Sequence, residues 1–186
     1  MWKITTAICC DLQKKNRMNK DIQIRDIVAA DNVRLAEIIR ASLEEFGAAK
    51  PGTVYFDATT DHLSDVFKAY GSRYFVVSIN GEVVGGGGLY PTENLPEGTC
   101  ELVKLYLAPE ARGLGIGRML MQKCEVEAFE FGYKNIYLET MPELNVAVPL
   151  YLKMNYQYLK APLGNSGHNG CNIWMIKKLG MGGDTM

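Results

Sequence analysis

The chain has 186 residues, a net charge of −1, 47% hydrophobic residues and 22% charged residues. This composition is typical of one globular domain that is long enough to bury a sizeable core. A near-neutral charge argues against a general binder of nucleic acid or membrane surfaces, because both need a clear excess of cations.

Thiol and imidazole side chains are few and scattered along the chain. The two histidines are His62 and His168, and no pair of cysteines has C-x-x-C spacing. We therefore expect no disulfide framework and no metal site, and reduced thiols of a cytoplasmic protein are the default. The five cysteines are Cys9, Cys10, Cys100, Cys124 and Cys171.

The N-terminal segment resembles a secretory signal only briefly. Its apolar stretch from Ile4 to Cys10 is short, contains two threonines, and leads into charged residues instead of a cleavage site. No stretch is long enough to span a bilayer. We expect residues 1–17 to be a flexible extension or to precede the native start at Met18. Residues 18–180 would form a single domain and residues 181–186 a flexible tail.

The first half of the chain predicts one strand, two helices and a hairpin. "DIQIRD" at 21–26 alternates polar and apolar residues, as a strand does. Apolar residues recur at helical spacing from Leu35 to Phe46, with Asp31 as the N-cap, and a short helix is expected near 63–70. The runs "RYFVVSI" and "EVVGGGGLY" are joined by Asn80-Gly81 and predict a hairpin.

The second half alternates strands and helices. "CELVKLYL", "NIYLET" and "CNIWMIKKL" predict strands, and "LNVAVPLYLKM" predicts a helix. Another helix follows the first of these strands, with an apolar face made by Ile116, Leu120, Cys124, Ala128 and Phe131. The order β-α-α-β-β-β-α-β-α-β-β predicts an α/β fold of the α+β type. Its central, twisted mixed sheet would be antiparallel in the first half and flanked by helices.

The stretch "LYLAPEARGLGIGRML", residues 105–120, places glycines where a helix must begin. The N–H groups at a helix N-terminus are unpaired and carry partial positive charge, so they can bind an anion. Gly113, Gly115 and Gly117 would let a phosphate approach the backbone, and Arg112 can add a charged donor. A simple strand-to-helix turn needs one glycine, so three alternating glycines favour a phosphate site.

Two nucleotide-binding motifs fit this loop poorly. The Walker A motif needs Lys followed by Ser or Thr after its last glycine, whereas Arg118-Met119 follows here. The dinucleotide fingerprint has a wider final spacing and opens an early βαβ unit, whereas this loop lies in mid-chain. A nucleotide-binding protein is therefore a weak hypothesis.

The segment "LVKLYLAPEARGLGIGRMLM" resembles the acyl-CoA-binding motif of the GNAT superfamily of N-acetyltransferases, Arg/Gln-x-x-Gly-x-Gly/Ala. The pattern falls on Arg112, Gly115 and Gly117. "VPLYLKMNYQYL" resembles the later Tyr-x-x-x-Gly-Phe segment, with Asn155-Tyr156 in place of Gly-Phe. Asn tolerates the left-handed conformation that Gly takes at a helix end, so this departure leaves the fold expectation intact. The likeness covers about residues 21–179 and is strongest at about 99–158.

The resemblance implies a GNAT-like fold that uses acetyl-CoA as co-substrate and no metal. The strand "CELVKLYL" would splay from "NIYLET", so that freed backbone groups pair with the pantetheine arm. The Leu107 amide would polarise the thioester carbonyl. Asn145 lies near an asparagine that contacts the cofactor arm in many members, and a helix cap is its alternative role. The expected cofactor-binding residues are Leu105, Tyr106, Leu107, Arg112, Gly113, Leu114, Gly115, Ile116, Gly117, Arg118 and Asn145.

Two side chains are candidates for catalysis. The resemblance places Tyr151 beside the CoA sulfur, where a phenol with a pKa near 10 suits proton donation to a thiolate. A core tyrosine is the alternative. Glu101 corresponds to a glutamate that acts as base, often through water, in part of the family. Glu101 would share a strand face with Val103, Leu105 and Leu107 unless a bulge intervenes, and apolar neighbours would raise its pKa. A solvated glutamate at a strand end is the alternative.

The acceptor side is less defined by the sequence. "GNSGHNGC", residues 164–171, lies where the acceptor pocket is often bordered in the family. His168 can be a second base, a substrate contact, or part of a polar turn. Tyr90 can line the acceptor side or belong to the core. "GGGG" at 85–88 indicates a bulge or a close approach within a strand, and Cys124 is expected to be a small core residue.

The leading hypothesis is an N-acetyltransferase that moves an acetyl group from acetyl-CoA to a primary amine by direct attack in a ternary complex. The alternative is a non-catalytic acyl-CoA-binding or regulatory module. A covalent acyl-enzyme on Cys171, assisted by His168, is a minor route. The expected acceptor is a small-molecule amine or a peptide amine. We expect no nucleic-acid or membrane partner and a cytoplasmic location, and the fold analogy allows a homodimer.

Overall fold

A seven-stranded mixed sheet forms the centre of the fold. The computed structural model describes residues 21–167 and 169–180. The strand order is β1-β2-β3-β4-β5-β7-β6. All neighbouring pairs are antiparallel except β4 and β5, which are parallel, so the predicted sheet is confirmed. The strands are β1 Ile22–Asp26, β2 Arg73–Ile79, β3 Glu82–Tyr90, β4 Thr99–Leu107, β5 Asn135–Thr140, β6 Gln157–Tyr158 and β7 Ile173–Lys178.

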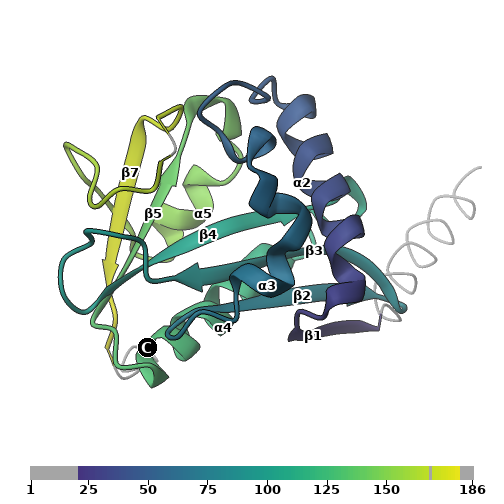
Figure 1. Ribbon diagram of the computed structural model, residues 1–186, viewed down its shortest axis with the longest axis horizontal. Helices are drawn as coiled ribbons and strands as arrows, with labels where there is room; N and C mark the ends of the chain where they lie inside the picture. The colour runs from purple at the N-terminus through teal and green to yellow at the C-terminus, as the bar shows by residue number, and fades with distance from the viewer. Residues whose placement is uncertain (1–20, 168, 181–186) are drawn as a thin grey trace, which may run out of the picture.

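Helices cover both faces of this sheet, in the predicted chain order. In Figure 1, α2 and α3 lie in front of the sheet, and α4 and α5 lie behind it. Each side has its own buried cluster, one around Leu35 and Tyr74 and the other around Ile116 and Met175. The helices are α2 Asn32–Glu45, α3 Leu63–Val66, α4 Ile116–Glu130 and α5 Val148–Lys153. Short 3-10 turns occupy Ala29–Asp31, Val54–Phe56, Ala58–His62, Pro109–Ala111 and Pro142–Leu144.

Three local predictions differ from the structure. Asp31 precedes α2 but does not cap it with its side chain. Its buried carboxylate instead accepts a hydrogen bond from the Val28 N–H (2.9 Å) and two from the Arg25 guanidinium (2.7 and 2.8 Å). The helix predicted at 144–154 is shorter, because a 3-10 turn precedes it. Phe131 lies just beyond α4 and is exposed, so it does not continue the apolar face.

Residues with positive φ end two elements as the sequence predicts. Asn80 (φ 53°) and Gly81 (φ 87°) are both left-handed, as the two-residue turn of a hairpin requires. Asn155 (φ 67°) follows α5 and takes the conformation usual for glycine at a helix end. Asn155 therefore does replace the family's glycine in backbone geometry.

The glycine run in β3 is explained by the close approach of an aromatic ring. A Cβ added to Gly86 would lie 2.5 Å from Cε1 of Tyr74, and one added to Gly88 would lie 2.7 Å from its Cδ2. The pairing of β3 with β4 also shifts register between Gly86 and Gly88. Both the bulge and the close approach predicted for "GGGG" are thus present.

The cysteines of the described ranges are free thiols. Cys100 and Cys124 are buried, and Cys171 is partly buried. Cys124 packs in the cluster around α4, as predicted for a core residue. Across residues 21–167 and 169–180, no helix has both the length and the hydropathy needed to cross a membrane.

Candidate active site

A bulge in β4 determines which side chains meet at the site. Val103 pairs with Gly88 and Tyr106 with Gly86, so β4 contains one more residue than β3 over this interval. The extra residue is accommodated at Lys104, whose φ of +50° is left-handed. Strict alternation is therefore broken. Leu105 and Leu107 pack against the buried cluster around Ile116 and Met175, which lies on the α4 side of the sheet. Val103 packs against the other cluster, around Leu35 and Tyr74, which lies on the α2 side.

The parallel pairing of β4 with β5 is short. It joins Thr99–Glu101 to Asn135–Tyr137 and extends no further along β4. The two strands then separate, which is the splay that the family resemblance implies. Leu105, Tyr106 and Leu107 are consequently available on this side to pair with an extended ligand.

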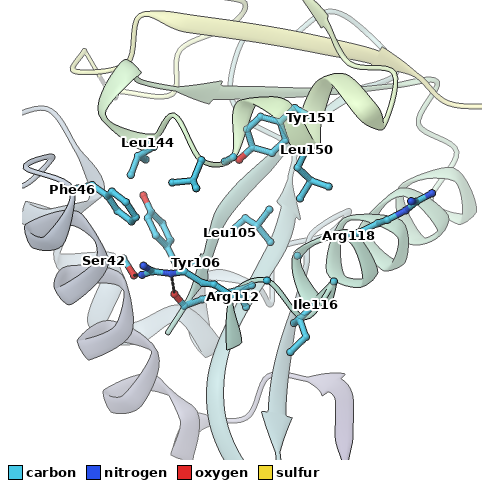
Figure 2. Close-up of a pocket in the computed structure, with 16 residues that line it drawn as sticks. Ser42, Phe46, Leu105, Tyr106, Arg112, Ile116, Arg118, Leu144, Leu150 and Tyr151 are labelled. Carbon is cyan, nitrogen blue, oxygen red and sulfur yellow. Dashed lines mark hydrogen bonds between the residues drawn. The ribbon is translucent and has the colours of Figure 1, made fainter. Parts of the chain in front are cut away.

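An apolar cavity lies where these strands separate, and we call it the larger cavity because a smaller one adjoins it. Its volume is about 360 Å³. Figure 2 shows it between β4, the start of α4, α5 and the C-terminal end of α2. Its lining is mostly apolar and includes nine of the residues predicted for cofactor binding, namely Leu105, Tyr106, Leu107, Arg112, Gly113, Gly115, Ile116, Gly117 and Arg118.

The glycine-rich loop presents open backbone to this cavity. Gly113 (φ 72°) and Gly115 (φ 81°) are left-handed, and a Cβ on either would meet no atom within 4 Å. Gly117 differs, because a Cβ there would lie 3.4 Å from Leu150 Cδ2. The first N–H with a helical acceptor is that of Met119, which donates to the Gly115 carbonyl at 3.1 Å. The preceding N–H groups are those that a phosphate could use.

Arg112 is anchored to α2. Its Nε donates to the Leu107 carbonyl at 2.9 Å, and its terminal nitrogens donate to Glu45 (2.7 Å) and Ser42 (3.3 Å). The guanidinium also lies over the Phe46 ring, 5.0 Å from its centroid. Arg112 was predicted from the sequence, but these α2 partners were not. Its donation to a phosphate stays a prediction.

Three of the predicted cofactor residues lie differently from the rest. Leu114 packs against the core cluster around α4 and does not line the cavity. In Figure 2, the Arg118 side chain points away from the cavity centre along α4. Asn145 is exposed, ends the Pro142–Leu144 turn and does not line the cavity. The capping alternative for Asn145 is wrong, because Ala147 precedes α5.

Tyr151 extends from α5 toward the larger cavity (Figure 2). Its side chain is buried, and its ring lies 6.0 Å from that of Tyr156. Burial raises the pKa of Tyr151 to about 12, so the phenol keeps its proton at neutral pH. A protonated phenol at the cavity wall can donate a proton; the catalytic role itself stays a prediction.

Glu101 is buried in β4, with only 4% of its surface exposed. The Thr92 hydroxyl donates a hydrogen bond to its Oε2. Burial raises the pKa of Glu101 to about 7, the Thr92 bond and Lys104 oppose that rise, and Glu139 adds to it. The alternative of a solvated glutamate is wrong, because the carboxyl group is buried, and burial shifts its pKa in the direction expected from the sequence.

A second, smaller cavity lies beside Glu101. Its volume is about 60 Å³, and its lining includes Lys104, Glu139 and Cys171. Tyr106 and Leu144 line both cavities, so the two adjoin there. Lys104 and Glu139 were not predicted from the sequence as site residues. A lysine inside the apolar run "LVKLYL" was the available signal, because a lysine is rarely buried without a role.

The acceptor-side predictions have mixed outcomes. Tyr90 lies opposite Glu101 in the β3–β4 pairing and packs edge-on against Phe67, with 5.8 Å between ring centroids. It lines neither cavity, which supports the core alternative. His168 lies outside the described residues. Burial raises the pKa of Cys171 to about 12, and a protonated thiol disfavours the covalent route.

The model of the acetyltransferase (GNAT) family matches residues 34–156. The chain belongs to this family. Its members' shared activity makes the protein an acyltransferase, and the glycine-rich loop and both cavities lie within or beside the matched segment. The non-catalytic alternative is therefore not favoured.

Named acetyltransferases are similar to this GNAT chain over most of its length. YjgM of Escherichia coli (strain K12), an uncharacterized N-acetyltransferase, is 36% identical over 157 residues, which are 84% of this chain and 94% of YjgM. The IAA acetyltransferase of Azospirillum brasilense is 31% identical over 127 residues, which are 67% of this chain and 80% of that protein.

Solved structures show the same fold. PaiA N-acetyltransferase of Thermoplasma acidophilum, solved with coenzyme A, aligns with a TM-score of 0.67 and 19% identity, covering 85% of this chain and 99% of PaiA. YncA of Salmonella typhimurium, solved with acetyl-CoA, aligns with a TM-score of 0.69 and 18% identity, covering 88% and 96%. The GNAT fold predicted from the sequence is confirmed.

Proposed function

We propose that the protein transfers an acetyl group from acetyl-CoA to a primary amine by direct attack in a ternary complex. One observation carries the proposal. Glu101 and Tyr151, a carboxyl group with a pKa near 7 and a protonated phenol, line two cavities that adjoin at Tyr106 and Leu144. This arrangement offers a base to one reactant and an acid to the other.

Two features of the larger cavity support acetyl-CoA as its ligand. The open backbone at Gly113 and Gly115, at the N-terminus of the 15-residue helix α4, suits the pyrophosphate. The strand edge Leu105–Leu107, which lacks a ladder to β5, suits the amide groups of the pantetheine arm. Acetyl-CoA supplies the acetyl group as a thioester, which is activated toward an amine.

Each of the chain's groups has a distinct task in this proposal. Glu101 accepts a proton from the acceptor ammonium, directly or through water, which frees the lone pair of the amine. The Leu107 amide donates to the carbonyl oxygen as negative charge develops there. Tyr151 donates its proton to the departing sulfur. Because the attack is direct, neither Cys171 nor His168 is needed as a nucleophile or its partner.

Incubation with acetyl-CoA and pooled amines tests the proposal. The pools are amino acids, polyamines, aminoglycosides, and peptides with free N-termini or lysines. We expect release of free CoA thiol in one pool, and an acetylated amine detectable by mass spectrometry. Calorimetry that shows tight acetyl-CoA binding, with no acetylated product in any pool, would contradict the proposal. The predicted cytoplasmic location and homodimer stay predictions.

A further inference from the structure

The smaller cavity contains charges of both signs. Glu101 and Glu139 contribute carboxyl groups, and Lys104 contributes an ammonium group. The Glu139 carboxylate is fixed by the Tyr137 hydroxyl (2.7 Å) and the Ser166 hydroxyl (2.8 Å). Under the proposed function this cavity receives the acceptor, so its charges indicate which acceptors it can bind.

The β4 bulge directs Lys104 into this cavity. In a regular strand, Lys104 would point to the face opposite Glu101 and Val103. Its left-handed backbone instead brings it into the same cavity lining as those two residues. A left-handed conformation is unfavourable for a residue with a Cβ, and such strain is concentrated at functional sites.

The Lys104 ammonium is buried but has bonding capacity to spare. Only 8% of its side chain is exposed, and its Nζ lies 3.3 Å from Asp57 Oδ2. An ammonium group has three donors, and burial without full pairing is costly. Burial accordingly lowers the pKa of Lys104, whereas Asp57 and Glu101 oppose that effect. A second anion inside the cavity would complete the coordination of the ammonium group.

We propose that Lys104 binds a carboxylate of the acceptor, so the acceptor is a small amine of the amino-acid class. The ammonium end of such a molecule meets Glu101, which is the base in the proposed function, and its carboxylate meets Lys104. The cavity volume of about 60 Å³ holds roughly four to five water-sized groups, which suits the charged head of an amino acid. A long polyamine or an aminoglycoside leaves the Lys104 ammonium with Asp57 alone and without a second anion.

A matched series of acceptors tests this inference on the wild-type protein. Each of several amino acids is compared with its amide and with its decarboxylated amine, in the same acetyl-CoA assay. We expect kcat/KM to be about 10- to 100-fold higher for the amino acid, because a charge-assisted hydrogen bond to Lys104 is lost in the analogues. The comparison with the amide is stringent, because the amide's amino group loses its proton more easily, so a larger fraction of it is neutral and able to attack.

Lys104→Met is the decisive variant, with Asp57→Asn as its control. Lys104→Met should abolish the preference for the amino acid over its decarboxylated amine. Any change that the substitution causes in the Glu101 pKa affects both acceptors alike and cancels in their ratio. Asp57→Asn removes the other partner of the lysine and should retain the preference. Thermal denaturation shows whether each variant is folded.

A binding measurement supplies a readout separate from turnover. Calorimetry measures the affinity of N-acetyl amino acids for the protein in the presence of CoA. These products should bind wild type at least about tenfold more tightly than they bind Lys104→Met. Acetylation confined to amines without a carboxylate would overturn the inference and leave the proposed N-acetyltransferase intact. So would an equal amino-acid preference in wild type and Lys104→Met. Absence of any acetylated product contradicts both proposals.

Discussion

The Tyr74 hydroxyl donates a hydrogen bond of 3.0 Å to the main-chain carbonyl of Lys104, the left-handed residue of the β4 bulge. The Tyr74 ring is buried and lies so close to Gly86 and Gly88 that neither position has room for a side chain. Tyr74 therefore connects the glycine run to the bulge. The bulge in turn directs Lys104 toward Glu101 and the leucines of β4 toward the larger cavity.

Gly86→Ala should destabilise the protein and disturb the site. A Cβ at Gly86 would lie 2.5 Å from the Tyr74 ring and 2.6 Å from the Phe75 carbonyl oxygen. Overpacking of this kind costs about 1–3 kcal/mol, which urea denaturation can measure. Gly180→Ala is the matched control, because a Cβ there meets nothing within 4 Å. Equal stability of the two variants would show that β3 adjusts without cost.

Much of the fold was predictable because the sequence carries local signals for it. Alternating polar and apolar residues predict strands, and Asn80-Gly81 predicts a hairpin turn. The helical spacing before Glu45 predicts a helix, and each of these signals is contained in a short segment. The bulge at Lys104 is different, because it depends on a contact between Tyr74 and a strand thirty residues away in sequence. Local patterns do not contain such a contact, so Lys104 was not predicted as a site residue.

The same distinction applies within the candidate site. Arg112 and the loop glycines form a local motif and were recognised from it. The partners of Arg112 come from α2, which precedes the motif by more than sixty residues. Burial of Glu101 likewise depends on Thr92 and on neighbouring strands, so the sequence left a solvated glutamate as an alternative. The capping alternative for Asn145 was wrong because the 3-10 turn at Pro142–Leu144 delays the start of α5 to Val148.

Arg112 and Glu45 should have opposite effects on the affinity for acetyl-CoA. Glu45 accepts a hydrogen bond from Arg112, which lowers the pKa of Glu45 and keeps it charged. Glu45 and a phosphate of acetyl-CoA would compete for the Arg112 guanidinium. Glu45→Gln removes the negative charge of one competitor and should lower the Kd of acetyl-CoA, most clearly at low salt. Arg112→Gln should raise the Kd. Calorimetry of both variants checks the prediction, and an increase in Kd for both would mean that Arg112 acts only by holding α2.

Tyr151→Phe should lower kcat by about 10²–10⁴-fold, the usual contribution of a general acid. The ring remains in place, so stability and the Kd of acetyl-CoA should be unchanged. Steady-state kinetics with calorimetry separate the two effects. Tyr158→Phe is the control, because Tyr158 is an exposed tyrosine of β6 that lines neither cavity. A Tyr151→Phe enzyme with wild-type kcat would assign proton donation to water.

Glu101→Gln should stabilise the protein above neutral pH. The pKa of Glu101 is about 7 in the folded protein and near 4.3 in an unfolded chain, so the folded state holds the proton more tightly. Wild-type stability therefore falls as pH rises from about 4 to about 7, by up to about 4 kcal/mol. The variant lacks this loss.

Urea denaturation of Glu101→Gln and wild type at pH 4 and pH 8 checks the prediction. The advantage of the variant should be larger at pH 8. Glu110→Gln, which changes an exposed glutamate in the turn after β4, is the control. A variant that is less stable than wild type at pH 8 would show that the Glu101 carboxylate is stabilised by its surroundings, contrary to the burial described above.

The pH dependence of kcat/KM for wild type and Glu101→Gln tests the central claim most directly. The ratio of the two profiles cancels the titration of the acceptor amine, which is common to both. We predict a ratio that rises tenfold per pH unit below about 7 and becomes constant above it, because only the charged carboxylate acts as base. A ratio near one at every pH would contradict the account and remove Glu101 from the catalytic site.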